Sequence, residues 1–198
     1  MTSFKELGLS ENTLKVLKRK GFEEPTPIQI KTIPAILQGK KDIVGQAQTG
    51  TGKTAAFGLP MIELLPEKSK TVQAIVLTPT RELAIQVADE INSLKGEKRL
   101  SIIPVYGGQS IELQLRSLKK GVDIVVGTPG RILDHLRRRT LRLDAISYLV
   151  LDEADEMLSD GHYNQSSSFQ NQIKTIVQKI PRESQICLFS ATMPNHVL

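Results

Sequence analysis

The chain carries the stretch Ala47-Gln48-Thr49-Gly50-Thr51-Gly52-Lys53-Thr54 between two apolar runs. Residues 42–45 before it predict a strand, and residues 55–59 after it can start a helix. A strand, a glycine-bearing loop and a helix that opens with Lys-Thr form the arrangement that holds a triphosphate. Backbone N–H groups would face the phosphate oxygens, Lys53 would add a positive charge, and the Thr54 hydroxyl would bind Mg²⁺.

This stretch departs from the general phosphate-loop pattern at one position. The pattern is G-x-x-x-x-G-K-[ST], and Ala47 stands where its first glycine should be. Gly50 and Gly52 still supply the backbone freedom that a tight loop needs. The alternative is a surface turn before an ordinary helix, but the strand and helix on either side favour the phosphate loop.

The composition describes an ordinary soluble protein. The chain has 198 residues, of which 39% are hydrophobic and 24% charged, and this length suits one domain better than two. Its formal net charge of +5 permits a polyanionic partner without requiring one. The single cysteine, Cys187, lies in an apolar run and is expected to be a small buried hydrophobe. We find no secretory signal and no apolar segment near the roughly 18 residues of a membrane span, so we expect a cytoplasmic protein without membrane contact.

Short apolar runs alternate with helical patterns along the chain. Strands are expected over 42–45, 74–78, 101–106, 122–126, 146–151 and 185–189. Helices are expected over 10–20, 26–39, 53–65, 81–95, 111–118, 129–137 and 173–180, with Pro34 kinking the second or leaving it irregular. This alternation predicts an α/β fold with a mostly parallel sheet and helices on both faces. The polar run 160–172 reads as an exposed loop.

Polar and glycine-bearing pairs follow the predicted strands. Besides the phosphate loop, these are Thr78-Pro79, Gly107-Gly108, Gly127-Thr128 and Asp152-Glu153. Because the carboxyl ends of parallel strands share one edge, we expect all of these segments on one rim of the sheet. Ligands of such sheets bind at that rim.

Two carboxylates end the apolar strand Leu149-Val150-Leu151. Burying an unpaired charge is costly, so a structural reason for them is lacking, whereas a phosphate loop gives them a use. Asp152 would hold Mg²⁺ through its water shell, opposite Thr54, and Glu153 would orient and deprotonate the attacking water. Lys53, Asp152 and Glu153 are therefore the predicted catalytic residues. The alternative is a helix N-terminus rich in acids.

Three further turns would meet a phosphate backbone on the same rim. Arg81 follows a strand at a helix N-terminus, Gly107-Gly108 allows another backbone to approach closely, and the turn 128–131 delivers a hydroxyl and the Arg131 guanidinium. Contacts of this kind bind with little sequence preference and strong salt dependence. The chain has no Trp and its aromatic residues form no stacking row, which argues against reading of single-stranded bases.

Taken together, these motifs resemble the first RecA-like domain of a DEAD-box ATP-dependent RNA helicase. Phe22 and Pro25-Thr26-Pro27-Ile28-Gln29 resemble the Q motif, and A-Q-T-G-T-G-K-T is the family's own form of the phosphate loop. The runs 79–83, 107–108 and 128–131 resemble its RNA-backbone motifs. Asp152-Glu153-Ala154-Asp155 gives the family its name, and Ser190-Ala191-Thr192 resembles the motif that couples hydrolysis to strand separation. The motifs occur in the family's order over almost the whole chain.

The resemblance implies a role for each matching residue. For ATP it implies Phe22, Pro27, Gln29, Ala47, Gln48, Thr49, Gly50, Thr51, Gly52, Lys53 and Thr54, with the aromatic residue and Gln29 reading adenine. For RNA it implies Pro79, Thr80, Arg81, Glu82, Gly107, Gly108, Thr128, Pro129, Gly130 and Arg131. For coupling it implies Asp155, Ser190 and Thr192. The ligands are ATP and Mg²⁺, the latter held largely through water by Thr54 and Asp152.

In that family a second RecA-like domain follows, so we expect this chain to be one domain, with a Q-motif region over 1–39 and an ATPase core over 40–198. Such a monomeric fragment should bind nucleotide but hydrolyse little of it, because the second domain supplies arginines to the γ-phosphate. Two alternatives stay open. One is a different RecA-like motor, such as a DNA translocase, and the other is a clamp that binds RNA and ATP without turnover.

Overall fold

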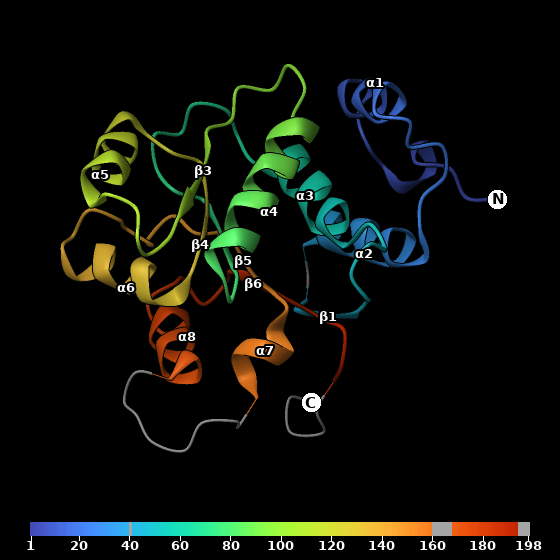
Figure 1. The fold of residues 1–198 in the computed structure, drawn as a ribbon. Helices are drawn as coiled ribbons and strands as arrows, with labels where there is room; N and C mark the ends of the chain where they lie inside the picture. The colour runs from blue at the N-terminus through green and yellow to red at the C-terminus, as the bar shows by residue number, and fades with distance from the viewer. Residues whose placement is uncertain (40, 160–167, 194–198) are drawn as a thin grey trace.

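A computed structural model describes residues 1–39, 41–159 and 168–193, and within them the chain folds around a six-stranded sheet (Figure 1). The strands are β1 (Ile43–Gln46), β2 (Ala74–Leu77), β3 (Ile102–Val105), β4 (Ile124–Gly127), β5 (Tyr148–Asp152) and β6 (Gln185–Ser190). They are ordered β1-β6-β5-β2-β4-β3, and every neighbouring pair is parallel. The predicted parallel sheet is confirmed.

The described ranges also contain a short 3₁₀ helix and eight α-helices, the first three of which precede β1. They are η1 (Lys5–Leu7), α1 (Glu11–Arg19), α2 (Pro27–Gln38), α3 (Lys53–Leu64), α4 (Arg81–Leu94), α5 (Ile111–Lys120), α6 (Pro129–Arg137), α7 (Ala154–Leu158) and α8 (Phe169–Val177). Helix α1 begins where Ser10 accepts a hydrogen bond from the Thr13 backbone N–H. Helix α2 has Pro at its first position and ends at Gly39 in the left-handed conformation.

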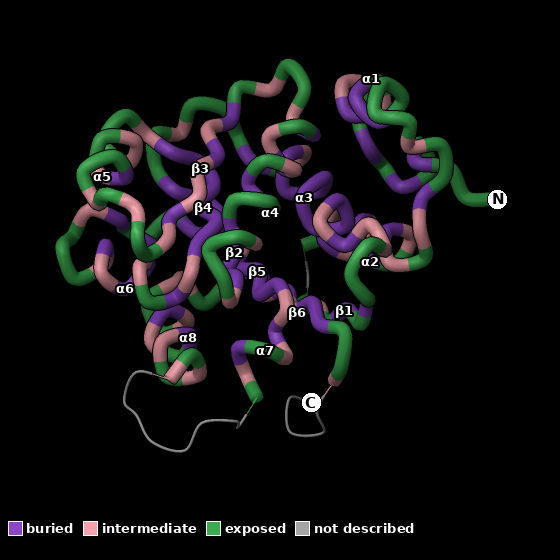
Figure 2. Tube along the Cα trace, viewed as in Figure 1, coloured by how far each residue is buried: buried purple, intermediate pink, exposed green. Residues whose placement is uncertain are grey.

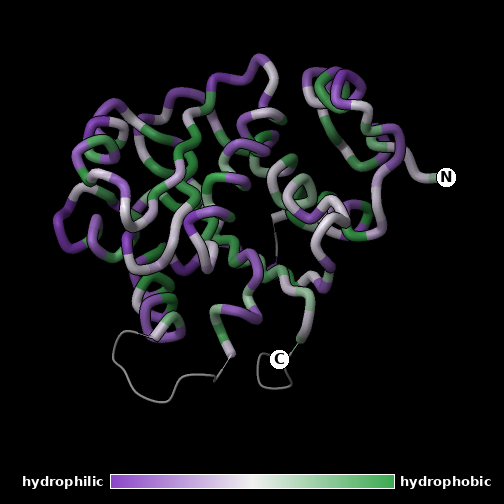
Figure 3. Tube along the Cα trace, viewed as in Figure 1, coloured by the Kyte–Doolittle hydropathy of each residue, from purple (hydrophilic) through white to green (hydrophobic). Residues whose placement is uncertain are grey.

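The central strands bury both of their faces, so the sheet lies between two layers of helices. In β2, Ala74 and Val76 join the core formed with α2, α3 and α4, whereas Ile75 and Leu77 join the core formed with α6, α7 and α8. Figure 2 shows the buried strands at the centre, and Figure 3 shows that hydrophobic residues gather there. Within the described ranges, no helix combines the length and apolarity needed to cross a membrane.

Three local expectations need correction. Helix α2 runs unbroken through Pro34, which was expected to kink it or leave it irregular. Helix α8 begins at Phe169 rather than 173, so the end of the expected polar loop 160–172 is helical, because the Ser168 hydroxyl accepts a hydrogen bond from Asn171 N–H and caps the helix. The short helix α7 after the acids was not predicted. The remaining part of that loop, 160–167, lies outside the described residues.

Candidate functional site: a phosphate loop and the strand-end rim

The phosphate loop joins the end of β1 to the start of α3. The Ala47 N–H donates to the Ser190 carbonyl at 2.9 Å, which ties the start of the loop to the end of β6. Gly50 and Gly52 have φ of +81° and +78°, a conformation that side chains with a Cβ rarely adopt. Helix α3 begins at Lys53, so its first N–H groups face the loop. The loop therefore has the backbone shape that an anion-binding site requires.

Lys53 and Asp152 form an ion pair at this site. Lys53 Nζ lies 2.8 Å from Asp152 Oδ1, and their side chains are 9% and 1% exposed. Burial raises the pKa of the Asp152 carboxyl, and the Lys53 ammonium opposes that rise. The sheet order explains the contact, because β6 alone separates β1 from β5. Two residues almost a hundred positions apart are thereby joined at one rim.

Glu153 has an unusual backbone conformation. Its φ of 54° and ψ of 50° are left-handed, which costs a non-glycine residue about 1–2 kcal/mol. Its N–H donates to Asp152 Oδ1 at 3.0 Å. Burial and then the neighbouring Glu156 raise the pKa of the Glu153 carboxyl, which suits a group that accepts a proton from water. Strain at this position is typical of a functional site.

The Mg²⁺ ligand set predicted from the sequence fits the donors at the rim. Asp152 supplies a carboxylate, and Thr54 lies one residue after its ion-pair partner Lys53. Among the residues that the structure describes, no group of three or more His, Cys, Asp or Glu side chains could hold a metal by itself. An oxygen site with few protein ligands is what Mg²⁺ uses when phosphate and water complete its shell.

Gln29 connects the Q-motif region to the phosphate loop. It is only 2% exposed, its Oε1 accepts from the Thr26 N–H at 2.9 Å, and its Nε2 donates to the Gly52 carbonyl at 3.1 Å. A Cβ on Gly52 would lie 2.3 Å from Gln29 Nε2, so only glycine admits this contact. A side-chain amide has two N–H groups and two lone pairs, so one of each is left for a further ligand. Pro27 begins the same helix.

Phe22 lies half-buried beside this region. Its ring packs against the core under α2 and α3, and Lys20 Nζ lies 5.9 Å from the ring centroid. The adenine role of Phe22 stays a prediction.

The three residues assigned to coupling are in mutual contact. The Thr192 N–H and hydroxyl donate to Asp155 Oδ2 at 3.2 and 2.9 Å, and the Asp155 N–H donates to Ser190 Oγ at 3.2 Å. Although burial works the other way, hydrogen bonds from Thr192 and Ser190 lower the pKa of the Asp155 carboxyl. Since Ser190 also accepts from Ala47, this cluster joins the D-E-A-D segment to the phosphate loop.

The predicted RNA-backbone residues line the same rim further along the sheet. Thr80 caps α4 by accepting from the Leu83 N–H at 3.2 Å, and Pro79 precedes it. Arg81 is exposed and pairs with Glu82 at 2.7 Å, which raises the pKa of the guanidinium. A Cβ on Gly108 would lie 3.5 Å from Arg81 Nη1, so the glycine pair borders this arginine.

The turn 128–131 lies on the same rim, where β4 ends and α6 begins. Thr128 precedes α6, whose first residues are Pro129 and Gly130. Arg131 Nη1 donates to the Gln109 carbonyl and to Gln114 Oε1, each at 3.3 Å, so the guanidinium lies against the turn that contains the glycine pair.

Sequence reasoning missed two buried polar residues behind this rim, Gln114 and His135. Gln114 is 2% exposed and His135 is fully buried. Gln114 follows Ile111 by three positions and therefore falls on the apolar face of α5, and a polar residue on an apolar face was the signal available. His135 is one of three histidines scattered along the chain, and their spacing gave no signal of a site. The other two, His162 and His196, lie outside the described residues.

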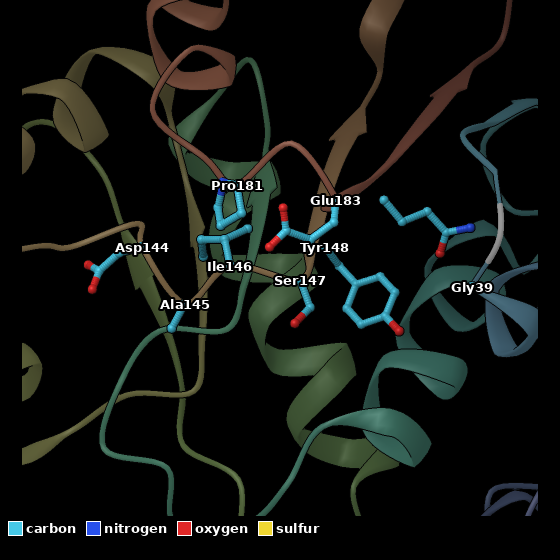
Figure 4. Close-up of a pocket in the computed structure, with 9 residues that line it drawn as sticks. Gly39, Asp144, Ala145, Ile146, Ser147, Tyr148, Pro181 and Glu183 are labelled. Carbon is cyan, nitrogen blue, oxygen red and sulfur yellow. The ribbon is translucent and has the colours of Figure 1, made fainter.

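A cavity of about 320 Å³ lies at the opposite edge of the sheet (Figure 4). It is lined by residues before or at the starts of β1, β5 and β6, among them Gly39, Ser147, Tyr148 and Gln185. These are the amino ends of the strands, so the cavity is separate from the rim described above.

Comparison with known proteins decides the family. The model of the family described as DEAD/DEAH box helicase matches residues 26–198. The chain belongs to this family. The DEAD-box chain is 58% identical over 197 residues to a protein named ATP-dependent RNA helicase CshA from Listeria monocytogenes, and 55% identical over 197 residues to a DEAD-box ATP-dependent RNA helicase CshA from Geobacillus kaustophilus. All of this chain is matched, but it spans only 36% and 40% of those two proteins.

Solved structures agree with the DEAD-box assignment. A DEAD box protein from the hyperthermophile Methanococcus jannaschii is 51% identical, with a TM-score of 0.91 over all of this chain and 52% of that one. A variant of S. cerevisiae Dbp5 bound to RNA and ADP BeF3 is 32% identical, with a TM-score of 0.86 over all of this chain and 48% of that one. The fold is therefore the RecA-like domain of DEAD-box proteins, as the sequence indicated.

Proposed function

We propose that this chain is the ATP-binding and RNA-binding half of an ATP-dependent RNA helicase that hydrolyses ATP to unwind or remodel short RNA duplexes. The observation that carries the proposal is the buried Lys53–Asp152 ion pair, with Glu153 next to it and the RNA-backbone residues on the same rim. The names of the relatives support it, since those proteins are called ATP-dependent RNA helicases.

Each group of residues at the site has a separate role in binding or hydrolysis. Lys53 and the N–H groups of the phosphate loop bind the β- and γ-phosphates, and Thr54 and Asp152 hold Mg²⁺ through water. Bound Mg²⁺ supplies charge neutralisation at the phosphates. Glu153 orients the attacking water and takes its proton. Gln29 and Phe22 read adenine, which favours ATP over GTP. Asp155, Ser190 and Thr192 transmit changes at the phosphates to the rim, where the arginines hold RNA.

The RNA partner is bound through its backbone, with little sequence preference. We further propose a second RecA-like domain in the full-length protein, since relatives are more than twice as long as the matched segment. That domain supplies an arginine to the γ-phosphate, which raises the rate of phosphoryl transfer by about a thousandfold or more.

This chain alone is then a monomer that binds nucleotide with little hydrolysis. Its proposed compartment is the cytoplasm, consistent with a single buried cysteine, Cys187.

The test is ATP hydrolysis by the two-domain protein, with single-stranded RNA, with DNA of the same sequence, and without nucleic acid. Stimulation by RNA alone, lost in Glu153→Gln, is the expected result. Equal or greater stimulation by DNA would instead support the translocase alternative. Binding of RNA and ATP without any turnover would support the clamp.

A further inference from the structure

Gln114, which lies outside the family motifs, is the centre of a buried hydrogen-bond network. Its Nε2 donates to the Tyr106 carbonyl at 3.0 Å and to Gln109 Oε1 at 2.9 Å. Its Oε1 accepts from Arg131 Nη1 at 3.3 Å and contacts His135 Nε2 at 2.7 Å. An amide offers two N–H groups and two lone pairs, so all four positions are used.

The Tyr106 carbonyl, which can only accept, and the Arg131 guanidinium, which can only donate, fix which way this amide points. Because Gln114 Oε1 can only accept, His135 Nε2 carries the proton in this contact. His135 Nδ1 lies 2.8 Å from Thr140 Oγ1, whose hydroxyl can donate to the bare nitrogen. Burial, together with the nearby Arg131, lowers the pKa of the imidazole, which keeps the ring neutral near pH 7. A turned amide would place an N–H against the Nε2–H and against the guanidinium, so only one orientation satisfies the network.

The network adds a side-chain link between two segments of the rim, the turn after β3 and the start of α6. The pairing of β3 with β4 and the Arg131 Nη1 bond to the Gln109 carbonyl also join these segments. The turn that carries Gly107 and Gly108 has no side chain at those two positions, and Gly108 has a φ of +87°. Gln114 holds both ends of this turn, at Tyr106 and at Gln109, and the same amide holds Arg131. One buried side chain therefore contacts both ends of the glycine turn and the guanidinium, and helps to fix the distance between them.

We propose that Gln114 and His135 are positioning residues of the RNA site, which hold the glycine turn and Arg131 at a fixed separation for neighbouring phosphates of one RNA strand. The inference rests on the proposed function, since it requires that the rim bind RNA. Preorganised donors bind a ligand more tightly than donors that must first be ordered. Breaking the network should therefore weaken RNA binding while leaving the nucleotide site intact, because no hydrogen bond among the described residues joins the network to the phosphate loop.

The test variant is Gln114→Met, which keeps the length of the side chain and removes all four hydrogen bonds. Binding of a 5′-fluorescein-labelled decauridylate is followed by anisotropy at low salt, binding of a fluorescent ADP analogue with Mg²⁺ is measured beside it, and thermal unfolding reports the fold. A positioning cost of about 1 kcal/mol predicts RNA binding weaker by about fivefold or more, with the ADP affinity unchanged within about twofold. Ser117→Ala is the matched control on the same helix, because its hydroxyl donates to the Leu113 carbonyl.

Equal RNA affinity in wild type and Gln114→Met would overturn the proposal. The amide NMR signals of Gly107 and Gly108 test the positioning independently of RNA, and they should shift or broaden in Gln114→Met and not in Ser117→Ala. A wild-type chain that binds no RNA would refute the proposed function, and unchanged glycine signals would refute the positioning role.

If Gln114→Met does not fold, Thr140→Val replaces it. That variant removes the hydroxyl on the far side of His135, and a smaller RNA loss is expected, whereas no loss would overturn the proposal.

Discussion

Removing one partner of the Lys53–Asp152 pair should destabilise the domain far more than removing both. The charges lie 2.8 Å apart, with side chains only 9% and 1% exposed, so a single substitution leaves the other charge buried and unpaired. Such a loss costs about 3–5 kcal/mol, whereas replacing both partners by apolar residues is often near neutral. Lys53→Met should therefore lower the midpoint of thermal unfolding by about 6–20 °C at this chain length. Lys53→Met/Asp152→Leu should recover most of that loss.

The measurement is urea unfolding of the wild type, both single variants and the double variant at pH 7.5. The expected coupling free energy is about 2 kcal/mol or more, at the upper end for residues in contact. The exposed pair Asp134–Arg138, with side chains 38% and 53% exposed, is the matched control and should show no measurable coupling. Acid should also reduce the Lys53→Met penalty, because Asp152 has a pKa raised by burial and becomes neutral once protonated. Additive single effects, with no coupling between the two positions, would refute the reasoning.

Three further predictions follow from other residues of the site. Glu153→Gly should relieve the left-handed backbone strain and stabilise the fold by about 1 kcal/mol in urea unfolding. The two-domain protein should lose ATP hydrolysis with this substitution. A variant less stable than the wild type would contradict the predicted gain in stability. Gly52→Ala should weaken binding of a fluorescent ADP analogue, since its Cβ would meet Gln29 Nε2, and unchanged affinity would exclude that contact. Burial lowers the pKa of His135, so the folded state takes up fewer protons than the unfolded state, and the free energy of unfolding should fall as the pH drops below about 6.5. In His135→Gln the free energy of unfolding should depend less steeply on pH in this range, and an equally steep dependence would be evidence against the prediction.

The sequence was sufficient for the strands, for most of the helices and for the rim, because these follow from local patterns. Apolar runs marked the strands, and the parallel arrangement placed their polar ends together. The start of α8 was missed because the serines before it were read as a loop, although Ser168 is a good helix cap.

The partners within the site could not be predicted, because they depend on the order of strands in the sheet. The order β1-β6-β5 brings Lys53 to Asp152, and no pattern along the chain records that order. The same holds for the Gln29 contact with Gly52 and for the Gln114–His135 network, which join residues from different elements. The left-handed backbone of Glu153 was equally out of reach, since its residue type gives no sign of it.

The proposed function requires that Gln29 connect adenine recognition to the phosphate loop of an ATPase. The most direct test is titration of the chain with fluorescent analogues of ADP and GDP in Mg²⁺, for wild type and Gln29→Ala, with Lys31→Ala, at an exposed position on the same helix, as the control. The wild type and the control should both show a clear preference for adenine, and Gln29→Ala should lose it. Equal affinity for the two nucleotides in wild type, or a preference that survives the substitution, would contradict it.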